Sequence, residues 1–207
     1  MTSTKRVLAS SALVASLLLG LAVPAGATPE APNVHPWLLT ISDMPSDVLT
    51  GWSTSPTSSP IRHGCWGPAV ELLSEHPGSS GSVGFQSGNH EGGEDLFSWS
   101  TASAARHAWS LTTTGLNRCH QYTTTDSGTR VVFDIETLSL GKYGNASAAY
   151  ELTFTLRGDS FGVDYLLALK GRAVAELYYS ELAVLLHVYL QFDVVPLFQK
   201  AMARVSG

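Results

Sequence analysis

Ser160 is the first residue whose surroundings suggest chemistry, because it lies in the small-residue segment Gly158-Asp159-Ser160-Phe161-Gly162. A serine nucleophile needs a base that takes its proton and donors that hold the developing negative charge. The only histidine downstream is His187, and Val184 stands three positions before it where an aspartate would be needed. Because the segment lies between two alternating apolar runs, we interpret it as a hairpin turn. A serine hydrolase that uses Ser160 is kept as the alternative.

A second cluster combines His90, Glu91, Glu94 and Asp95 within a few positions. One imidazole and several carboxylate oxygens are ligands that a metal ion accepts. The glycine pair at 92–93 interrupts the cluster, so residues 89–95 are interpreted as a solvated hairpin loop between brief strands at 83–86 and 96–99. The sequence therefore predicts no metal site and no cofactor.

The chain has two cysteines, Cys65 and Cys119. An even count in an exported chain favours one disulfide. In the loop-entropy model such a bond restricts the unfolded chain by up to about 4 kcal/mol. The alternative, a catalytic thiol, requires an unpaired sulfur beside a base.

Export is predicted by the N-terminus. Lys5 and Arg6 precede the mostly apolar run Val7 to Val23, and Ala25-Gly26-Ala27 has the small-x-small pattern of a cleavage site. Residues 1–27 are thus expected to be a signal peptide, and no membrane span is expected after its removal. No cysteine precedes Cys65, so lipid attachment at the cleavage site is excluded. The expected location is extracellular or in the cell envelope.

The charge balance limits the classes of partner. Removal of Lys5 and Arg6 from the 12 basic side chains leaves ten against 17 acidic ones, a net charge of about −7 with histidine neutral. A chain without Lys or Arg clusters and with this balance is a poor match for nucleic acid or anionic lipid. A neutral, apolar or basic partner is expected.

The stretch from Thr129 to Tyr179 has the clearest periodicity. From Tyr150 to Arg157 every even position is apolar and every odd one polar, the pattern of a half-buried antiparallel strand. Similar runs at 131–136, 161–169 and 173–179 are separated by short turn-forming segments. Four consecutive strands of a meander are predicted, with one apolar face.

Helices must cover that face. Pro68–Leu73 and the Ala-rich run from Thr101 or Ser103 to Leu116 have helical spacing, as does Asp193–Arg204 with its stripe of Leu197, Phe198, Ala201, Met202 and Val205. A further short helical turn is expected at 37–41, and Trp52 is expected to anchor a surface loop. The run Leu182 to Leu190 fits a strand and a helix equally well, and both stay open.

The predicted fold class is α+β, a twisted antiparallel meander with the helices packed on one face and one disulfide. Residues 28–36 hold three prolines and are expected to be a flexible leader, and 37–207 a single domain. Aromatic residues at periodic positions usually belong to the core. Tyr178, Trp99 and Glu176 are nevertheless the candidates for lining a cleft, because Tyr178 shares a strand face with Glu176 and not with Leu177.

The order of these parts resembles a known family. The first matching segment is Leu38-Leu39-Thr40-Ile41-Ser42-Asp43-Met44-Pro45, and it is followed by Gly51-Trp52 and then Cys65. After these come a strand pair, an Ala-rich helix that ends at Cys119, and a strand that follows Lys170-Gly171-Arg172. In this the chain is similar to secreted actinobacterial sensor domains related to the extracellular domain of PknH-like mycobacterial receptor kinases.

The resemblance implies a single α+β domain with a cleft for an extracellular ligand, and it brings no catalytic residues. The chain departs from the kinases in having no kinase domain and one cysteine pair where two are expected. A secreted, non-enzymatic envelope protein that binds a small or lipid-like molecule or an envelope protein is therefore expected, with a structural or host-interaction role as a further alternative.

Overall fold

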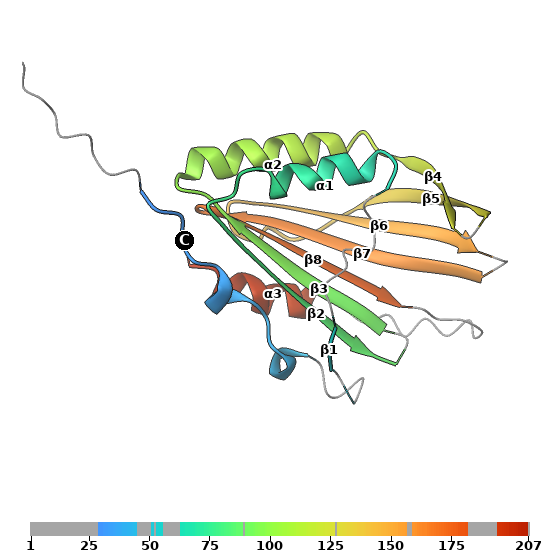
Figure 1. The fold of residues 1–207 in the computed structure, drawn as a ribbon, viewed down its shortest axis with the longest axis horizontal. Coiled ribbons are helices and arrows are strands. Elements are labelled where there is room, and N and C mark those ends of the chain that lie inside the picture. Colours follow the sequence, from blue (N-terminus) through green and yellow to red (C-terminus); the bar gives the residue numbers. More distant parts are fainter. Residues whose placement is uncertain are drawn as a thin grey trace, which may run out of the picture.

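The computed structural model describes residues 29–44, 51, 53–55, 63–88, 90–126, 128–156, 159–181 and 194–206. Its centre is one antiparallel sheet of eight strands in the order β1-β2-β3-β8-β7-β6-β5-β4 (Figure 1). The strands are β1 Ser53–Ser55, β2 Ser79–Ser87, β3 His90–Ser98, β4 Gln121–Asp126, β5 Thr129–Leu138, β6 Ala146–Leu156, β7 Asp159–Lys170 and β8 Ala173–Glu181.

The sheet consists of two meanders that meet at one strand pair. β1 to β3 form the first and β4 to β8 the second, and β3 pairs antiparallel with β8 in the middle of the sheet. The predicted four-strand meander corresponds to β5–β8 and is confirmed. The chain passes from one meander to the other through helix α2 (Ala102–Leu116).

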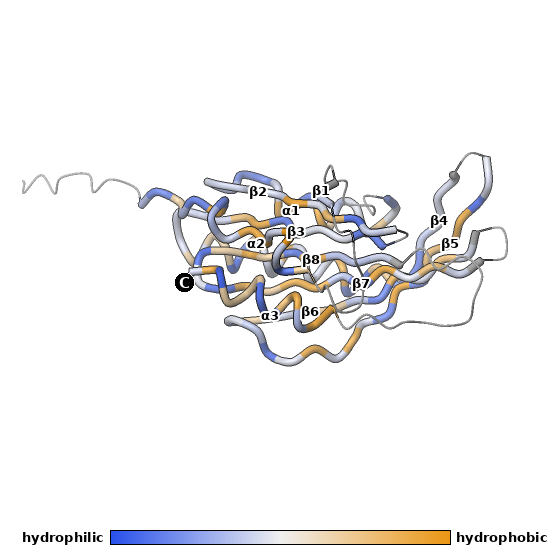
Figure 2. The backbone as a smooth tube through the Cα atoms, turned by 90° about the horizontal axis from the view of Figure 1, so that it is seen from below, coloured by the Kyte–Doolittle hydropathy of each residue, from blue (hydrophilic) through white to orange (hydrophobic). Residues whose placement is uncertain are grey.

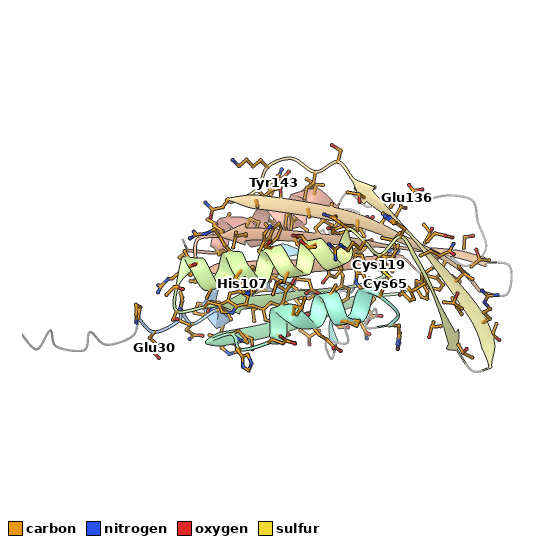
Figure 3. The ribbon with its side chains drawn as sticks, turned by 90° about the horizontal axis from the view of Figure 1, so that it is seen from above. Glu30, Cys65, His107, Cys119, Glu136 and Tyr143 are labelled. Carbon is orange, nitrogen blue, oxygen red and sulfur yellow. A yellow bond between two sulfur atoms is a disulfide. The ribbon has the colours of Figure 1, made fainter. Side chains whose placement is uncertain are left out.

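Two antiparallel helices cover one face of the sheet, called here the α1/α2 face. Helix α1 (Trp66–Ser74) begins directly after Cys65, and α2 begins at Thr101, whose side chain accepts a hydrogen bond from the Ala104 N–H. The helices approach closely, since a Cβ at Gly115 would lie 2.7 Å from the Cβ of Ala69. The predicted disulfide is confirmed: Cys65 and Cys119 join the start of α1 to the end of α2 (Figure 3).

The C-terminal helix α3 (Val194–Arg204) lies on the opposite face, called the α3 face (Figure 1). Its predicted stripe is buried there, against Leu166, Ala168 and Leu177. The expectation that all helices share one face is therefore wrong. The physical reason is that β7 and β8 are apolar on both sides: Leu167 and Leu169 face α1 and α2 while Leu166 and Ala168 face α3. Hydrophobic residues, in orange, recur along the tube of β7 in Figure 2.

Residues 29–44 also lie on the α3 face. They contain two short 3-10 helices, η1 (His35–Trp37) and η2 (Ile41–Asp43), in place of the single turn predicted at 37–41. The sequence predicts a flexible leader over 28–36, but Val34 is fully buried and the Pro32 carbonyl accepts a hydrogen bond from Ser98 at 2.6 Å. Prolines favour extended backbone, and here that backbone is packed against the sheet.

Residues 90–95 are the main correction to the predicted strands. The sequence suggests a solvated loop there, whereas the structure places them inside β3, paired with β2 on one side and β8 on the other. Gly92 and Gly93 are not turn residues. Gly93 lies under the ring of Tyr178, which a Cβ at this position would overlap. A Cβ at Gly92 would come within 3.1 Å of the Tyr178 carbonyl oxygen.

Three predictions fall outside the described residues: the signal peptide at 1–27, the anchor Trp52, and the Leu182–Leu190 run. Within the described ranges, every helix is too short or too polar to cross a membrane.

Candidate functional site

A polar cluster lies beneath the helices in the middle of the sheet. Successive side chains of a strand point to opposite faces, so Glu176 and Tyr178 of β8 lie on the α1/α2 face while Leu177 and Tyr179 lie on the other. Across the β3–β8 pair, Asp95 is the direct neighbour of Glu176, and Gly93 is the neighbour of Tyr178. Residues of the two meanders that are far apart in the sequence therefore lie side by side at the β3–β8 pair.

Gly93 positions the ring of Tyr178. A Cβ at this position would overlap the hydroxyl oxygen of Tyr178, so the absence of a side chain lets the ring lie across β3. The residues two positions either side of Gly93 on the same face are Glu91 and Asp95. The Tyr178 hydroxyl thus lies over the strand between two carboxylate-bearing residues.

The Tyr178 hydroxyl is buried and has no hydrogen-bond partner in the part of the chain that the structure describes. Tyr178 is 1% exposed, and among the described residues none donates to or accepts from its oxygen. Burial, with the negative charges of Asp95, Glu91 and Glu176, raises the pKa of Tyr178 well above its ordinary value. The hydroxyl therefore stays protonated, available both to donate and to accept.

Other polar groups are enclosed on the same face. Within the described chain, Trp66 Nε1 and the Thr112 hydroxyl are fully buried and lack partners, while Trp66 packs edge-on against Tyr165 at 5.0 Å between ring centroids. A buried polar group left unpaired costs about 1–3 kcal/mol. Several such groups between one pair of helices and one sheet mark this region as the candidate site.

The carboxylates of the cluster are not equivalent. Asp95 and Glu176 are 5% and 1% exposed, and each has interactions of its own. Glu91 is half-buried at the margin of the cluster. Among the described residues, no group of three or more His, Cys, Asp or Glu is arranged to hold a metal ion.

The cleft candidates from the sequence divide between two places. Tyr178 and Glu176 both belong to the cluster, but Trp99 is buried past the end of β3, roughly 20 Å along the strand from Gly93 at about 3.3 Å per residue. Glu91 and Asp95 were noted in the sequence as part of a loop cluster, but their place with Gly93 in a strand was missed because the segment lacks the alternating apolar pattern of a strand. Nothing in the sequence of β8 indicates that it pairs with β3.

Ser160 lies at the exposed start of β7. Its hydroxyl is 3.3 Å from that of Thr155, which is not a base, and His187 lies outside the described residues. The hydrolase alternative stays a prediction without a described base.

A second polar site lies on the α3 face and serves the fold. Glu94 is fully buried, and its Oε2 accepts a hydrogen bond from the Leu39 N–H at 2.6 Å. Burial raises the pKa of Glu94 to about 7, against the opposing effects of that hydrogen bond and of Arg204. Arg204 in turn donates to the Leu38 carbonyl and pairs with Asp43, both at 2.7 Å. The network joins residues 38–43 to β3 and to the end of α3.

No protein-family model and no curated protein matches this chain. Among solved structures it is similar to the extracellular domain of PknH from Mycobacterium tuberculosis, with a TM-score of 0.51 and 11% sequence identity over 81% of this chain and 90% of that chain. The two chains share a fold. At this identity the relationship is a distant one of fold, and membership of the family stays a prediction.

Proposed function

We propose that this chain is a secreted, non-enzymatic envelope protein whose sensor-like domain binds a small molecule at the cluster around Tyr178. The observation that carries the proposal is the buried Tyr178 hydroxyl, which has no partner among the described residues although burial makes an unpaired hydroxyl costly. A bound molecule with a polar group would satisfy it.

The location has separate support. The structural neighbour is an extracellular domain, and disulfides persist in oxidising compartments outside the cytosol. The predicted signal at 1–27 agrees with both. A measured mass of the secreted protein that equals the mass of a chain starting at Thr28 would establish the cleavage site.

The experiment is native mass spectrometry of the full-length gene product purified from culture medium, followed by denaturation to release bound molecules. We expect a reproducible small mass with the wild type, diminished in Tyr178→Phe. Tyr143→Phe is the matched control, because its hydroxyl accepts from Gln199 on the other face of the sheet. A clean apoprotein in all three samples would contradict a small-molecule site and favour an envelope protein as the partner.

A further inference from the structure

The charges that act on the Tyr178 hydroxyl have one sign. Glu91 and Asp95 flank it along β3, and Glu176 precedes it on the same face of β8. Their negative charges raise its pKa in addition to burial, and no cation of the described chain offsets them there. A neutral or negative group entering this position would lose hydration without an electrostatic gain, whereas a positive group would gain one.

The shape of the cluster argues against a bare metal ion. The acidic side chains do not converge in the way that three ligands of one ion must, as far as the described residues show. An ammonium group is larger and its hydrogen bonds point in several directions, so it can reach a hydroxyl and separated carboxylates together.

Further aromatic residues follow Tyr178 on the same face of the sheet. Tyr165 of β7 is the direct cross-strand neighbour of Tyr178, and Trp66 packs edge-on against Tyr165. Aromatic faces attract cations and also accept the apolar body of a ligand. The cluster thus combines negative charge with an apolar wall.

The β2 neighbours of the cluster are exposed. On β2, Ser82 is paired with Asp95 and Gln86 with Glu91, and both β2 residues are exposed. Glu91 itself is half-buried. An approach from β2 would therefore bring a ligand to Glu91 before it reaches the buried Tyr178.

Building on the proposed function, we propose that the cluster binds the primary ammonium group of a small organic molecule. The Tyr178 hydroxyl oxygen accepts one N–H, and Glu91, Asp95 and Glu176 supply the negative charge. Because Asp95 and Glu176 have interactions of their own, the assignment rests on Tyr178 and Glu91. The acidic balance of the whole chain, 17 acidic against 12 basic side chains, is consistent with a basic ligand.

The test is isothermal titration calorimetry of the disulfide-bonded secreted protein with hexylammonium chloride near neutral pH, beside 1-hexanol as the uncharged probe of similar length. We expect saturable binding of hexylammonium and binding of hexanol at least roughly tenfold weaker, since only the ammonium group can make charge-assisted hydrogen bonds here. Glu91→Gln should weaken hexylammonium binding about tenfold and Tyr178→Phe about fivefold. Glu136→Gln, an exposed carboxylate on β5, is the control and should bind as the wild type (Figure 3).

Equal binding of hexanol and hexylammonium, or equal affinities in Glu91→Gln and Glu136→Gln, would overturn the ammonium assignment. Glu91 is half-exposed, so its substitution is expected to leave the protein folded, and circular dichroism verifies this. Failure of the ammonium assignment can be distinguished from failure of the proposed small-molecule site. If native mass spectrometry finds a bound uncharged molecule that depends on Tyr178, the site stands and only its preference for a cation is wrong.

Discussion

Replacement of Glu94 by glutamine should stabilise the protein increasingly as the pH rises. Glu94 is fully buried on the α3 face, and burial raises its pKa from 4.5 to about 7. A carboxyl whose pKa is higher in the folded state contributes stability below its unfolded pKa and loses that contribution as the pH rises through the folded pKa. Ionisation of Glu94 therefore opposes folding between these two values.

The magnitude follows from the two pKa values. At 1.36 kcal/mol for each pH unit between them, the free energy of unfolding should fall by about 3 kcal/mol from this group between pH 4 and pH 8. Glutamine cannot ionise, and its side-chain oxygen can still accept from the Leu39 N–H, the bond that Glu94 accepts at 2.6 Å. The stability difference between Glu94→Gln and wild type should thus grow by about 3 kcal/mol over this pH range.

The assay is urea unfolding followed by circular dichroism at pH 4, 6 and 8, with the free energy of unfolding extrapolated to water. Glu136→Gln, which removes an exposed carboxylate from β5, is the matched control and should give a difference nearly independent of pH. A Glu94→Gln difference that is the same at pH 4 and pH 8 would refute the reasoning, because the carboxylate would then cost nothing when ionised in the fold.

Further predictions concern the same interfaces. Gly93→Ala should lower the free energy of unfolding by about 1–3 kcal/mol, because the new Cβ must displace the Tyr178 hydroxyl. Gly162→Ala on β7 is the control: its Cβ meets nothing close, so the free energy of unfolding should fall by less than about 0.5 kcal/mol. Replacing Cys65 and Cys119 together by serine should cost up to about 4 kcal/mol in urea unfolding, and an unchanged midpoint would show that the bond does not restrict the unfolded chain. Arg204→Ala removes the donor to Leu38 and the pair with Asp43, so amide hydrogen exchange should accelerate at residues 38–44 and not in β7; uniform acceleration would contradict a local role.

The strands of the second meander were predictable because their pattern is local. Alternation at 131–136 and 150–156 requires one covered face, and the helical stripe at 197–205 requires a partner of its own. The disulfide also followed from local facts, an even cysteine count in a chain that is predicted to be exported. Each of these predictions depends on residues that are close in sequence or on composition, and each is confirmed for the described residues.

The candidate site could be predicted only in part. Tyr178 and Glu176 were identifiable because alternate positions of a strand share one face of the sheet, and these two residues are two positions apart. The place of Asp95, Gly93 and Glu91 beside them was not, since their segment has no apolar alternation and its glycine pair is typical of a turn. The ring of Tyr178, on a strand some 80 positions later, explains Gly93.

The sequence by itself determined the composition of each element: which residues alternate, which form helical stripes, which cysteines can pair, and how acidic the chain is. Only the tertiary structure decided that β3 inserts beside β8, that α3 covers the face opposite to α1 and α2, and that residues 29–44 pack on the sheet. The physical reason is that a strand buried on both faces, such as β7, offers two apolar surfaces. The choice of face then depends on connections and on buried charges such as Glu94, and these act across long sequence separations.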